Sequence, residues 1–257
     1  MSVSYELRDG IAVLWLDDPA RRNALSRAIV SGMLAALTRS RDDNARAIVL
    51  AGRGTAFCAG ANIDDLRDGW MEGREPDTDP THLFQALTEE PRVVIAAVQG
   101  AALGGGFELT LACDLVLASA QALFALPELG VGVIPNTAAA RLQRIIGSRM
   151  ALELILTRRR VPSAEAAKLG LVNKVIDASA DVVAEAVAFA GQIVSQAGPG
   201  AIAAAKRAQH GHAATDWERV RASLLEVPRA EWQEGLDAFT EKRPPDFSRF
   251  WAAGRDG

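Results

Sequence analysis

Cysteine and histidine are scarce in this sequence of 257 residues. It holds two cysteines, Cys58 and Cys113, and three histidines, His82, His210 and His212. Two cysteines exclude a disulfide scaffold and suit a reducing compartment. These five side chains are too few and too scattered for a structural zinc site. We therefore expect no metal and a cytoplasmic location.

Long hydrophobic runs and an excess of basic charge are also absent. Apolar stretches such as 93–98 fall well short of the ~20 residues that a membrane span requires, and the start MSVSYELRDG does not have the pattern of a signal peptide. The net charge of −4 gives no basic field that would attract nucleic acid. We expect a soluble protein with no membrane or nucleic-acid partner, whose length suits one or two domains with a sizeable core.

Several motifs of common enzymes are missing as well. The sequence has no G-K-S/T of a P-loop, no G-x-S-x-G of a hydrolase and no H-E-x-x-H of a zinc protease. Gly104 and Gly106 begin a dinucleotide fingerprint, but Leu109 stands at the position of its third glycine. A Rossmann-type dinucleotide site is therefore not expected.

The hydrophobic pattern that is present predicts an α/β fold. Residues 3–7 and 11–16 are expected to form a hairpin with an Asp-Gly turn, and apolar positions at helical spacing predict a helix over 26–39 with Ser26 as its N-cap. Further apolar strands are expected at 45–50, 92–98, 115–118, 122–125 and 171–176. Continuous apolar strands separated by helices are typical of a buried parallel sheet.

Two segments interrupt this pattern. Residues 69–81 are polar and broken by Gly and Pro, so we expect a mobile surface loop there, and 195–200 (SQAGPG) is the clearest break in the chain. We divide the chain into an α/β core over 1–195 and a C-terminal helical segment over 196–257. Because this segment is too small to stand alone, we expect it to pack on its own core or on another subunit, as an oligomerisation segment.

Two glycine-containing turns, at 56–63 and 100–108, each follow a strand and lead towards a helix. Glycine lets a ligand approach backbone N–H groups closely, and one N–H from each turn could hold a single oxygen on which negative charge develops. Taken singly, each turn is more typical of an ordinary loop that needs positive φ angles. Spacing alone therefore leaves both interpretations open.

Two glutamates accompany these turns. Glu108 lies in the first turn of the helix after the glycines, and Glu128 follows the strand at 122–125. Glu108 would also suit the helix dipole, although Gly105 stands where a capping box needs Ser or Thr, and Glu128 would also suit a solvated turn. Two carboxylates beside an oxyanion site would suit proton transfer to water and to a carbon next to a carbonyl, so they form a candidate pair.

Ordered motifs over nearly the whole chain resemble the crotonase family, also called the enoyl-CoA hydratase/isomerase superfamily. They are DDPARRNALS near 18–26, RGTAFCAGANIDDL at 53–66, VIAAVQGAALGGGFELTLACDLVLAS at 94–119, FALPELGVGVIP at 124–135, LTRRRVPSAEAAKLGLVNKV at 156–175 and EGLDAFTEKRPPDF at 234–247. The resemblance implies a spiral of ββα units followed by a helical trimerisation segment, assembled as a homotrimer or a dimer of trimers.

The resemblance also implies an acyl-CoA thioester as the substrate. By motif match, its thioester oxygen would be held by the N–H groups of Ala61 and Gly105, in agreement with the two-turn interpretation. In hydratases of the family two glutamates, here Glu108 and Glu128, activate one water, add its oxygen to the β-carbon and deliver a proton to the α-carbon. No cofactor is expected, because coenzyme A is part of the substrate.

The presence of both glutamates favours an enoyl-CoA hydratase that adds water to a 2-trans-enoyl-CoA. Two alternatives stay open, namely a double-bond isomerase that relies chiefly on Glu128 and a weakly active crotonase-fold binding protein. The family's G-x-G-G-T-Q-R-L turn is replaced over 136–141 by a shorter segment, so that Asn136 would have to offer the N–H for the catalytic water. A second departure, at 228–233, affects the helix that borders the acyl pocket and therefore the substrate range.

The resemblance places further residues at the substrate. They are Ala59, Gly60, Asn62, Gly104, Asn136 and Lys242. Lys242 matches a lysine near the CoA phosphates of a neighbouring subunit, although a solvated lysine is an equally good interpretation. Trp70 would either line the acyl pocket or anchor its loop, and the run 158–160 of three arginines is interpreted as an exposed turn. Cys58 is interpreted as a small packing residue.

Overall fold

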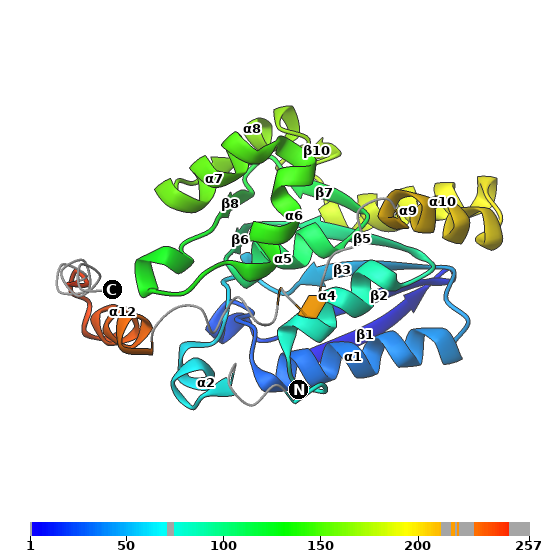
Figure 1. Cartoon of the computed structure of the whole chain (residues 1–257). Coiled ribbons are helices and arrows are strands. Elements are labelled where there is room, and N and C mark those ends of the chain that lie inside the picture. Colours follow the sequence, from blue (N-terminus) through cyan, green and yellow to red (C-terminus); the bar gives the residue numbers. More distant parts are fainter. Residues whose placement is uncertain (1, 71–74, 212–216, 219, 221–228, 247–257) are drawn as a thin grey trace.

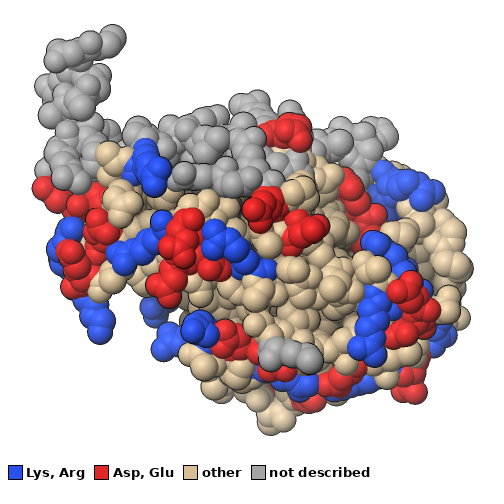
Figure 2. All heavy atoms as spheres, turned by 90° about the horizontal axis from the view of Figure 1, so that it is seen from below, with Lys and Arg blue, Asp and Glu red and all other residues tan. Residues whose placement is uncertain are grey.

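The computed structural model describes residues 2–70, 75–211, 217, 218, 220 and 229–246 (Figure 1). Of the segments singled out above, the loop over 69–81 lies outside these ranges at 71–74, and the C-terminal segment over 196–257 lies outside them at 212–216, 219, 221–228 and 247–257, which include His212 and residues 228 and 247. Within them no helix combines the length and the apolar character that a membrane crossing needs. Figure 2 shows acidic and basic side chains interspersed over one face of the molecule, in keeping with a net charge of −4.

A six-stranded sheet forms the centre of the fold, in the strand order β1-β2-β3-β5-β7-β10. Its strands are β1 (Val3–Arg8), β2 (Ile11–Leu16), β3 (Ala47–Gly52), β5 (Val93–Val98), β7 (Leu115–Ser119) and β10 (Lys174–Ile176). β1 and β2 form the expected antiparallel hairpin, and every other neighbouring pair is parallel. The predicted parallel α/β fold is confirmed, although its last strand begins only at Lys174.

Alternate side chains of this sheet enter two different cores. The even-numbered residues of β2 join the larger core with α1 (Arg27–Asp42) and α4 (Pro80–Glu89), whereas the odd-numbered ones face α9 (Val182–Gln196). Ser26 is the N-cap of α1, as expected, because its side chain accepts from the Ile29 N–H at 3.3 Å. Both faces of the sheet are covered, which explains strands that are apolar without alternation.

A second, four-stranded sheet carries the two glycine turns. Its order is β4-β6-β8-β9, with β4 (Ala56–Cys58), β6 (Ala101–Leu103), β8 (Leu123–Ala125) and β9 (Val161–Pro162). β4, β6 and β8 are parallel, and they lead towards α2 (Ile63–Arg67), α5 (Gly105–Ala112) and the 3₁₀ helix η2 (Glu128–Val131). Parallel pairing therefore brings both glycine turns and the segment with Glu128 to one edge of this sheet.

The remaining helices lie after the second glycine turn, apart from η1. They are η1 (Pro19–Arg21), α6 (Asn136–Ile146), α7 (Ser148–Thr157), α8 (Ser163–Lys168), α10 (Pro199–Gly211) and α12 (Arg229–Glu241). α9 ends at Gln196 and α10 begins at Pro199, so the expected break is real but short. α12 packs against η2 of its own chain, where a Cβ on Gly235 would clash with the backbone of Val131. The division into a core and an oligomerisation segment stays a prediction.

The expected surface loop over 69–81 is buried at both ends. Trp70 is only 3% exposed, and its indole Nε1 donates to the Thr78 carbonyl at 2.8 Å. Asp79 caps α4 by accepting from the Thr81 N–H at 2.7 Å. The prediction of a mobile surface loop is wrong at Trp70 and Asp79. A polar composition with Gly and Pro is also compatible with a turn that buries a single aromatic ring. Residues 71–74 lie outside the described ranges.

Candidate active site

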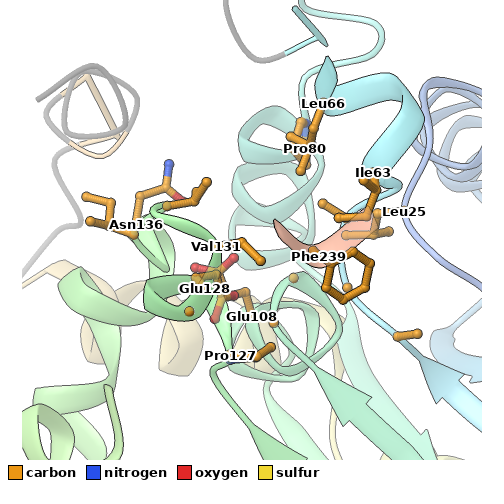
Figure 3. A pocket seen from close by; sticks show the side chains of 18 of the residues that line it. Leu25, Ile63, Leu66, Pro80, Glu108, Pro127, Glu128, Val131, Asn136 and Phe239 are labelled. Carbon is orange, nitrogen blue, oxygen red and sulfur yellow. The ribbon is translucent and has the colours of Figure 1, made fainter. Parts of the chain in front are cut away.

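A cavity of about 350 Å³ lies where the edge of the smaller sheet meets α5, η2 and α6. Figure 3 shows the side chains of Glu108 and Glu128 close together in this cavity. Much of the wall is apolar and comes from Leu25, Ile63, Leu66, Trp70, Pro80, Phe84, Pro127, Val131, Val133, Ile134 and Phe239. Of the predicted site residues, all but Asn62 and Lys242 line the cavity.

Two backbone N–H groups from the glycine turns lie side by side in this wall. Leu25 pairs with the first turn, because its N–H donates to the Gly60 carbonyl at 2.7 Å and its carbonyl accepts from the Asn62 N–H at 2.6 Å. The Ala61 N–H between them therefore points away from Leu25. Gly105 is the first residue of α5, so its N–H has no acceptor within the helix. A Cβ on Gly105 would lie 3.9 Å from the Ala61 nitrogen.

The second turn requires glycine at two positions. Gly104 has a φ of 53° and a ψ of −125°, and a Cβ there would come within 2.8 Å of Oε1 of Glu128. A Cβ on Gly106 would clash with the backbone of Cys58 in the strand before the first turn. A side chain at either position would thus push the two turns apart or displace Glu128.

Glu108 is buried and is held by the start of another helix. Its side chain is on α5, and its Oε1 accepts a hydrogen bond from the Ala138 N–H at 2.9 Å. Ala138 lies in the first turn of α6, where the helix dipole also favours a negative charge. Burial raises the pKa of Glu108 to about 7, while the N–H groups of Ala138 and Thr137 act in the opposite direction. Such a carboxyl group can accept and return a proton near neutral pH.

Glu128 faces the same cavity without comparable support. Both of its carboxylate oxygens are buried, and neither has a hydrogen-bond partner within the described residues. Burial raises the pKa of Glu128 well above its usual value, and the negative charge of Glu108 raises it further. The repulsion between the two carboxylates therefore opposes their ionisation together, so the pair favours a state with one negative charge and one proton.

Nearly the whole chain matches one protein family. The model described as enoyl-CoA hydratase/isomerase matches residues 6–249. The chain belongs to the enoyl-CoA hydratase/isomerase family. A probable enoyl-CoA hydratase of Rhodobacter capsulatus is 36% identical over 96% of this chain and 98% of the relative, and a crotonyl-CoA hydratase of Syntrophomonas wolfei is 33% identical over 96% and 97%. The crystal structure of a carnitinyl-CoA hydratase from Mycobacterium avium matches with a TM-score of 0.83 at 32% identity, covering 96% of this chain and 98% of that one.

These matches confirm the crotonase-family resemblance and the α/β fold that it implied, whereas the trimerisation that it also implied stays a prediction. The glycine-rich turn expected for the family after Pro135 is instead the start of α6. Asn136, the first residue of this helix, has no positive φ, and its side-chain amide donates to the Val220 carbonyl at 3.1 Å. The N–H that reaches a glutamate here belongs to Ala138, which the sequence analysis missed. Pro135 could have indicated that a helix begins here, because proline is typical of the start of a helix.

Two predicted residues lie outside the cavity wall. Asn62 is the N-cap of α2, where its side-chain oxygen accepts from the Asp65 N–H at 3.1 Å. Its side chain is thus committed to the helix, whereas its backbone N–H pairs with Leu25. Lys242 directly follows α12, is exposed and has a φ of 55°. The role of Lys242 against a neighbouring subunit stays a prediction.

Two further aromatic side chains, Trp70 and Phe239, line the cavity. Trp70, whose role the sequence left undecided, both lines the cavity and anchors its segment through the Thr78 carbonyl. Phe239 reaches the cavity from α12, although 58% of it is exposed (Figure 3). No local pattern could have identified Phe239, because every other described residue that lines the cavity comes from the first 158 residues of the chain.

Cys58 lies beneath the second turn and is a packing residue, as expected. It is fully buried, and burial raises the pKa of its thiol to about 12, so it carries no thiolate at neutral pH. In the part of the chain that the structure describes, no group of three or more His, Cys, Asp or Glu side chains is placed to hold a metal ion. The polar groups that line the cavity include two carboxyl groups and the backbone N–H groups of the two glycine turns.

Proposed function

We propose that this protein is an enoyl-CoA hydratase, which adds water across the double bond of a 2-trans-enoyl-CoA thioester. The observation that carries the proposal is the pair Glu108 and Glu128, which share one cavity and are surrounded differently. Glu108 accepts a hydrogen bond from the Ala138 N–H, whereas both carboxylate oxygens of Glu128 are buried without a hydrogen-bond partner within the described residues. The relatives named crotonyl-CoA hydratase and short-chain-enoyl-CoA hydratase, each 33% identical, support the reaction class.

The N–H groups of Ala61 and Gly105 hold the thioester oxygen. When an oxygen nucleophile adds to the β-carbon, the electrons of the double bond move towards the thioester, and its oxygen becomes that of an enolate. Donors that are already in place stabilise this charge without rearrangement, at roughly 3 kcal/mol for one such donor. The Gly105 donor also lies at the positive end of α5.

The two glutamates divide the proton transfers between them. Glu108 accepts a proton from water while the water oxygen attacks the β-carbon. Glu128 then delivers its own proton to the α-carbon of the enolate, so that the product has gained one hydroxyl group and one hydrogen. The proton left on Glu108 returns to Glu128 within the pair or through solvent before the next turnover.

Coenzyme A is bound as part of the substrate, so the reaction needs no separate cofactor. Gly60 and Gly104 offer backbone groups beside the thioester, the Ala59 carbonyl offers an acceptor to the adenine of coenzyme A, and Asn136 lines the same cavity. The apolar wall that includes Trp70 and Phe84 receives the acyl chain, because such a surface favours hydrocarbon over water. The predicted cytoplasmic location stays a prediction.

We further propose that the chain assembles as a homotrimer or a dimer of trimers, with 196–257 among the contacting segments. Leu152 and Leu156 on α7 support self-association, because they are 55% and 58% exposed and assembly would bury them. Light scattering on the full chain tests this proposal. A mass of one chain at micromolar concentration would contradict it.

The proposed activity is tested by mixing the protein with crotonyl-CoA and following the loss of the conjugated enoyl absorbance. We expect rapid loss with the wild type and none with Glu108→Gln or Glu128→Gln, while Glu153→Gln, a change at the surface, leaves the rate unaltered. No loss with crotonyl-CoA or a longer enoyl-CoA would contradict hydration. Movement of a 3-enoyl double bond that depends on Glu128 alone would then identify an isomerase.

A further inference from the structure

One basic side chain stands in the wall of the cavity. Among the described residues that line it, Arg158 is the only lysine or arginine. Its guanidinium lies directly against Gly130 of η2, since a Cβ on Gly130 would clash with Nη1 of Arg158. Because η2 begins with Glu128, this positive charge is held on the same turn as the proposed acid.

Among the residues that the structure describes, Arg158 has no acidic partner, in contrast to the arginine beside it. Arg159 forms ion pairs with Glu153 at 2.7 Å and with Glu165 at 2.8 Å. Within the described part of the chain, no ion pair or side-chain hydrogen bond involves Arg158. The five N–H donors of its guanidinium are therefore available to a ligand.

The backbone holds Arg158 in a conformation that suits glycine better. Its φ of 55° and ψ of 20° are left-handed, and its N–H closes α7 by donating to the Leu154 carbonyl at 3.0 Å. Glycine ends helices in this conformation without the crowding of a Cβ. An arginine at such a position, next to a glycine that leaves room for its guanidinium, points to a function for the side chain.

We infer that Arg158 binds an anionic group of the thioester ligand at the cavity. That group is either a carboxylate on the acyl chain or a phosphate of coenzyme A, both of which a guanidinium binds through paired hydrogen bonds. The inference rests on the proposed function, because it takes an acyl-CoA as the ligand. It adds a recognition residue to a site otherwise described by its proton transfers.

Equilibrium binding of saturated thioesters tests the inference without any turnover. Isothermal titration calorimetry is carried out with butyryl-CoA, with S-butyryl-pantetheine, which lacks the nucleotide and its phosphates, and with glutaryl-CoA, which carries a second carboxylate. The variants are Arg158→Gln and Arg158→Gly, and the matched control is Arg160→Gln, which removes an exposed charge two residues away from the cavity wall.

If Arg158 binds a phosphate, both variants weaken butyryl-CoA by about tenfold and leave S-butyryl-pantetheine unchanged. If it binds an acyl carboxylate, the loss is confined to glutaryl-CoA. Arg158→Gly should keep or raise the melting temperature, since it relieves the left-handed residue, so weaker binding in this variant cannot come from a damaged helix end.

Equal affinities of wild type and both variants for all three thioesters would overturn the inference, as would an equal loss in Arg160→Gln. A wild type that binds none of them would also overturn it. A wild type that binds butyryl-CoA through Arg158 but does not hydrate crotonyl-CoA would instead contradict the proposed function and leave the inference standing.

Discussion

Glu108 and Glu128 are the same residue type in the same cavity, but the protein surrounds them differently. Glu108 faces the start of α6 and accepts a hydrogen bond from the Ala138 N–H, whereas the carboxylate of Glu128 has no hydrogen-bond partner within the described residues. Burial raises the pKa of both. At Glu108 the N–H groups of Ala138 and Thr137 act against this rise, whereas at Glu128 the charge of Glu108 adds to it and only the residue's own backbone N–H acts against it. The comparison teaches that backbone neighbours can divide one residue type into a proton acceptor and a proton donor.

The largest expected effect comes from removing either carboxyl group. Glu108→Gln and Glu128→Gln should each lower kcat for crotonyl-CoA by about 10²- to 10⁴-fold, because each loses one proton transfer. Their stabilities should differ, since Glu128→Gln removes a buried carboxyl group that has no partner, whereas Glu108→Gln removes a charge that α6 stabilises. Chemical denaturation of the two variants measures this difference.

The pH dependence of that stability follows from the direction of the shift. A carboxyl group whose pKa is raised by folding costs no stability below its usual pKa of 4.5, where it is protonated in both states. As pH rises above 4.5, ionisation favours the unfolded chain. Glu128→Gln should therefore be more stable than the wild type at pH 8, by about 1–3 kcal/mol, and equal to it near pH 4. A gain of the same size at both pH values would contradict this account.

A smaller effect is expected when only the support of Glu108 is removed. Ala138→Pro deletes the N–H that donates to Oε1, at a place in the first helical turn where proline is tolerated. The pKa of Glu108 should rise, and kcat at pH 7 should fall about 10- to 100-fold. Ala138→Gly keeps the N–H and serves as the control. Identical pH profiles in the two variants would show that this hydrogen bond does not set the difference between the glutamates.

The dependence of the wild-type kcat on pH should show the titration of both Glu108 and Glu128. Below the pKa of Glu108, about 7, the base is protonated, so kcat should fall by up to about tenfold for each pH unit. At higher pH, Glu128 loses its proton and kcat should fall again. Stopped-flow hydration of crotonyl-CoA over pH 5–10 measures this bell shape, whose two limbs belong to the coupled pair. A rate that is flat through pH 7 would contradict the assignment of Glu108.

The smallest effect is a shift in the pKa of one glutamate when the other is changed. The charge of Glu108 raises the pKa of Glu128, so Glu108→Gln should lower that pKa. In the opposite direction, the charge of Glu128 is not among the causes that raise the pKa of Glu108, so Glu128→Gln should leave the pKa of Glu108 near 7. Carbon-13 NMR of labelled glutamate carboxyl groups measures both values. If the pKa of the remaining glutamate shifted equally in the two variants, the proposal that Glu108 ionises before Glu128 would be contradicted.

Much of the fold and the main parts of the candidate site could be predicted from the sequence. The hairpin, the buried strands and the helix capped by Ser26 follow from local periodicity and capping, which act over a few residues. The two turns with Ala61 and Gly105 could be identified because glycine is visible in the sequence and has a physical reason to be there. Their meeting in one cavity was implied only by the family resemblance.

What could not be predicted depends on backbone atoms and on distant contacts. The donor to Glu108 is a main-chain N–H of Ala138, and no side chain marks that role in the sequence. Trp70 lies in a segment whose polar composition concealed its burial. Phe239 reaches the cavity from a helix near the chain end, through packing that no local period encodes.

The contact between Gly235 and Val131 has a consequence for how mutations in this protein would group. α12 lies against η2 with no room for a methyl group, and η2 carries Glu128 at its first position. A substitution at Gly235 must move the turn that holds the proposed acid, although the two residues are far apart in the sequence. In a scan of all single substitutions, Gly235 would therefore cluster by phenotype with the glycines around the cavity, and the end of the chain would behave genetically as part of the active site.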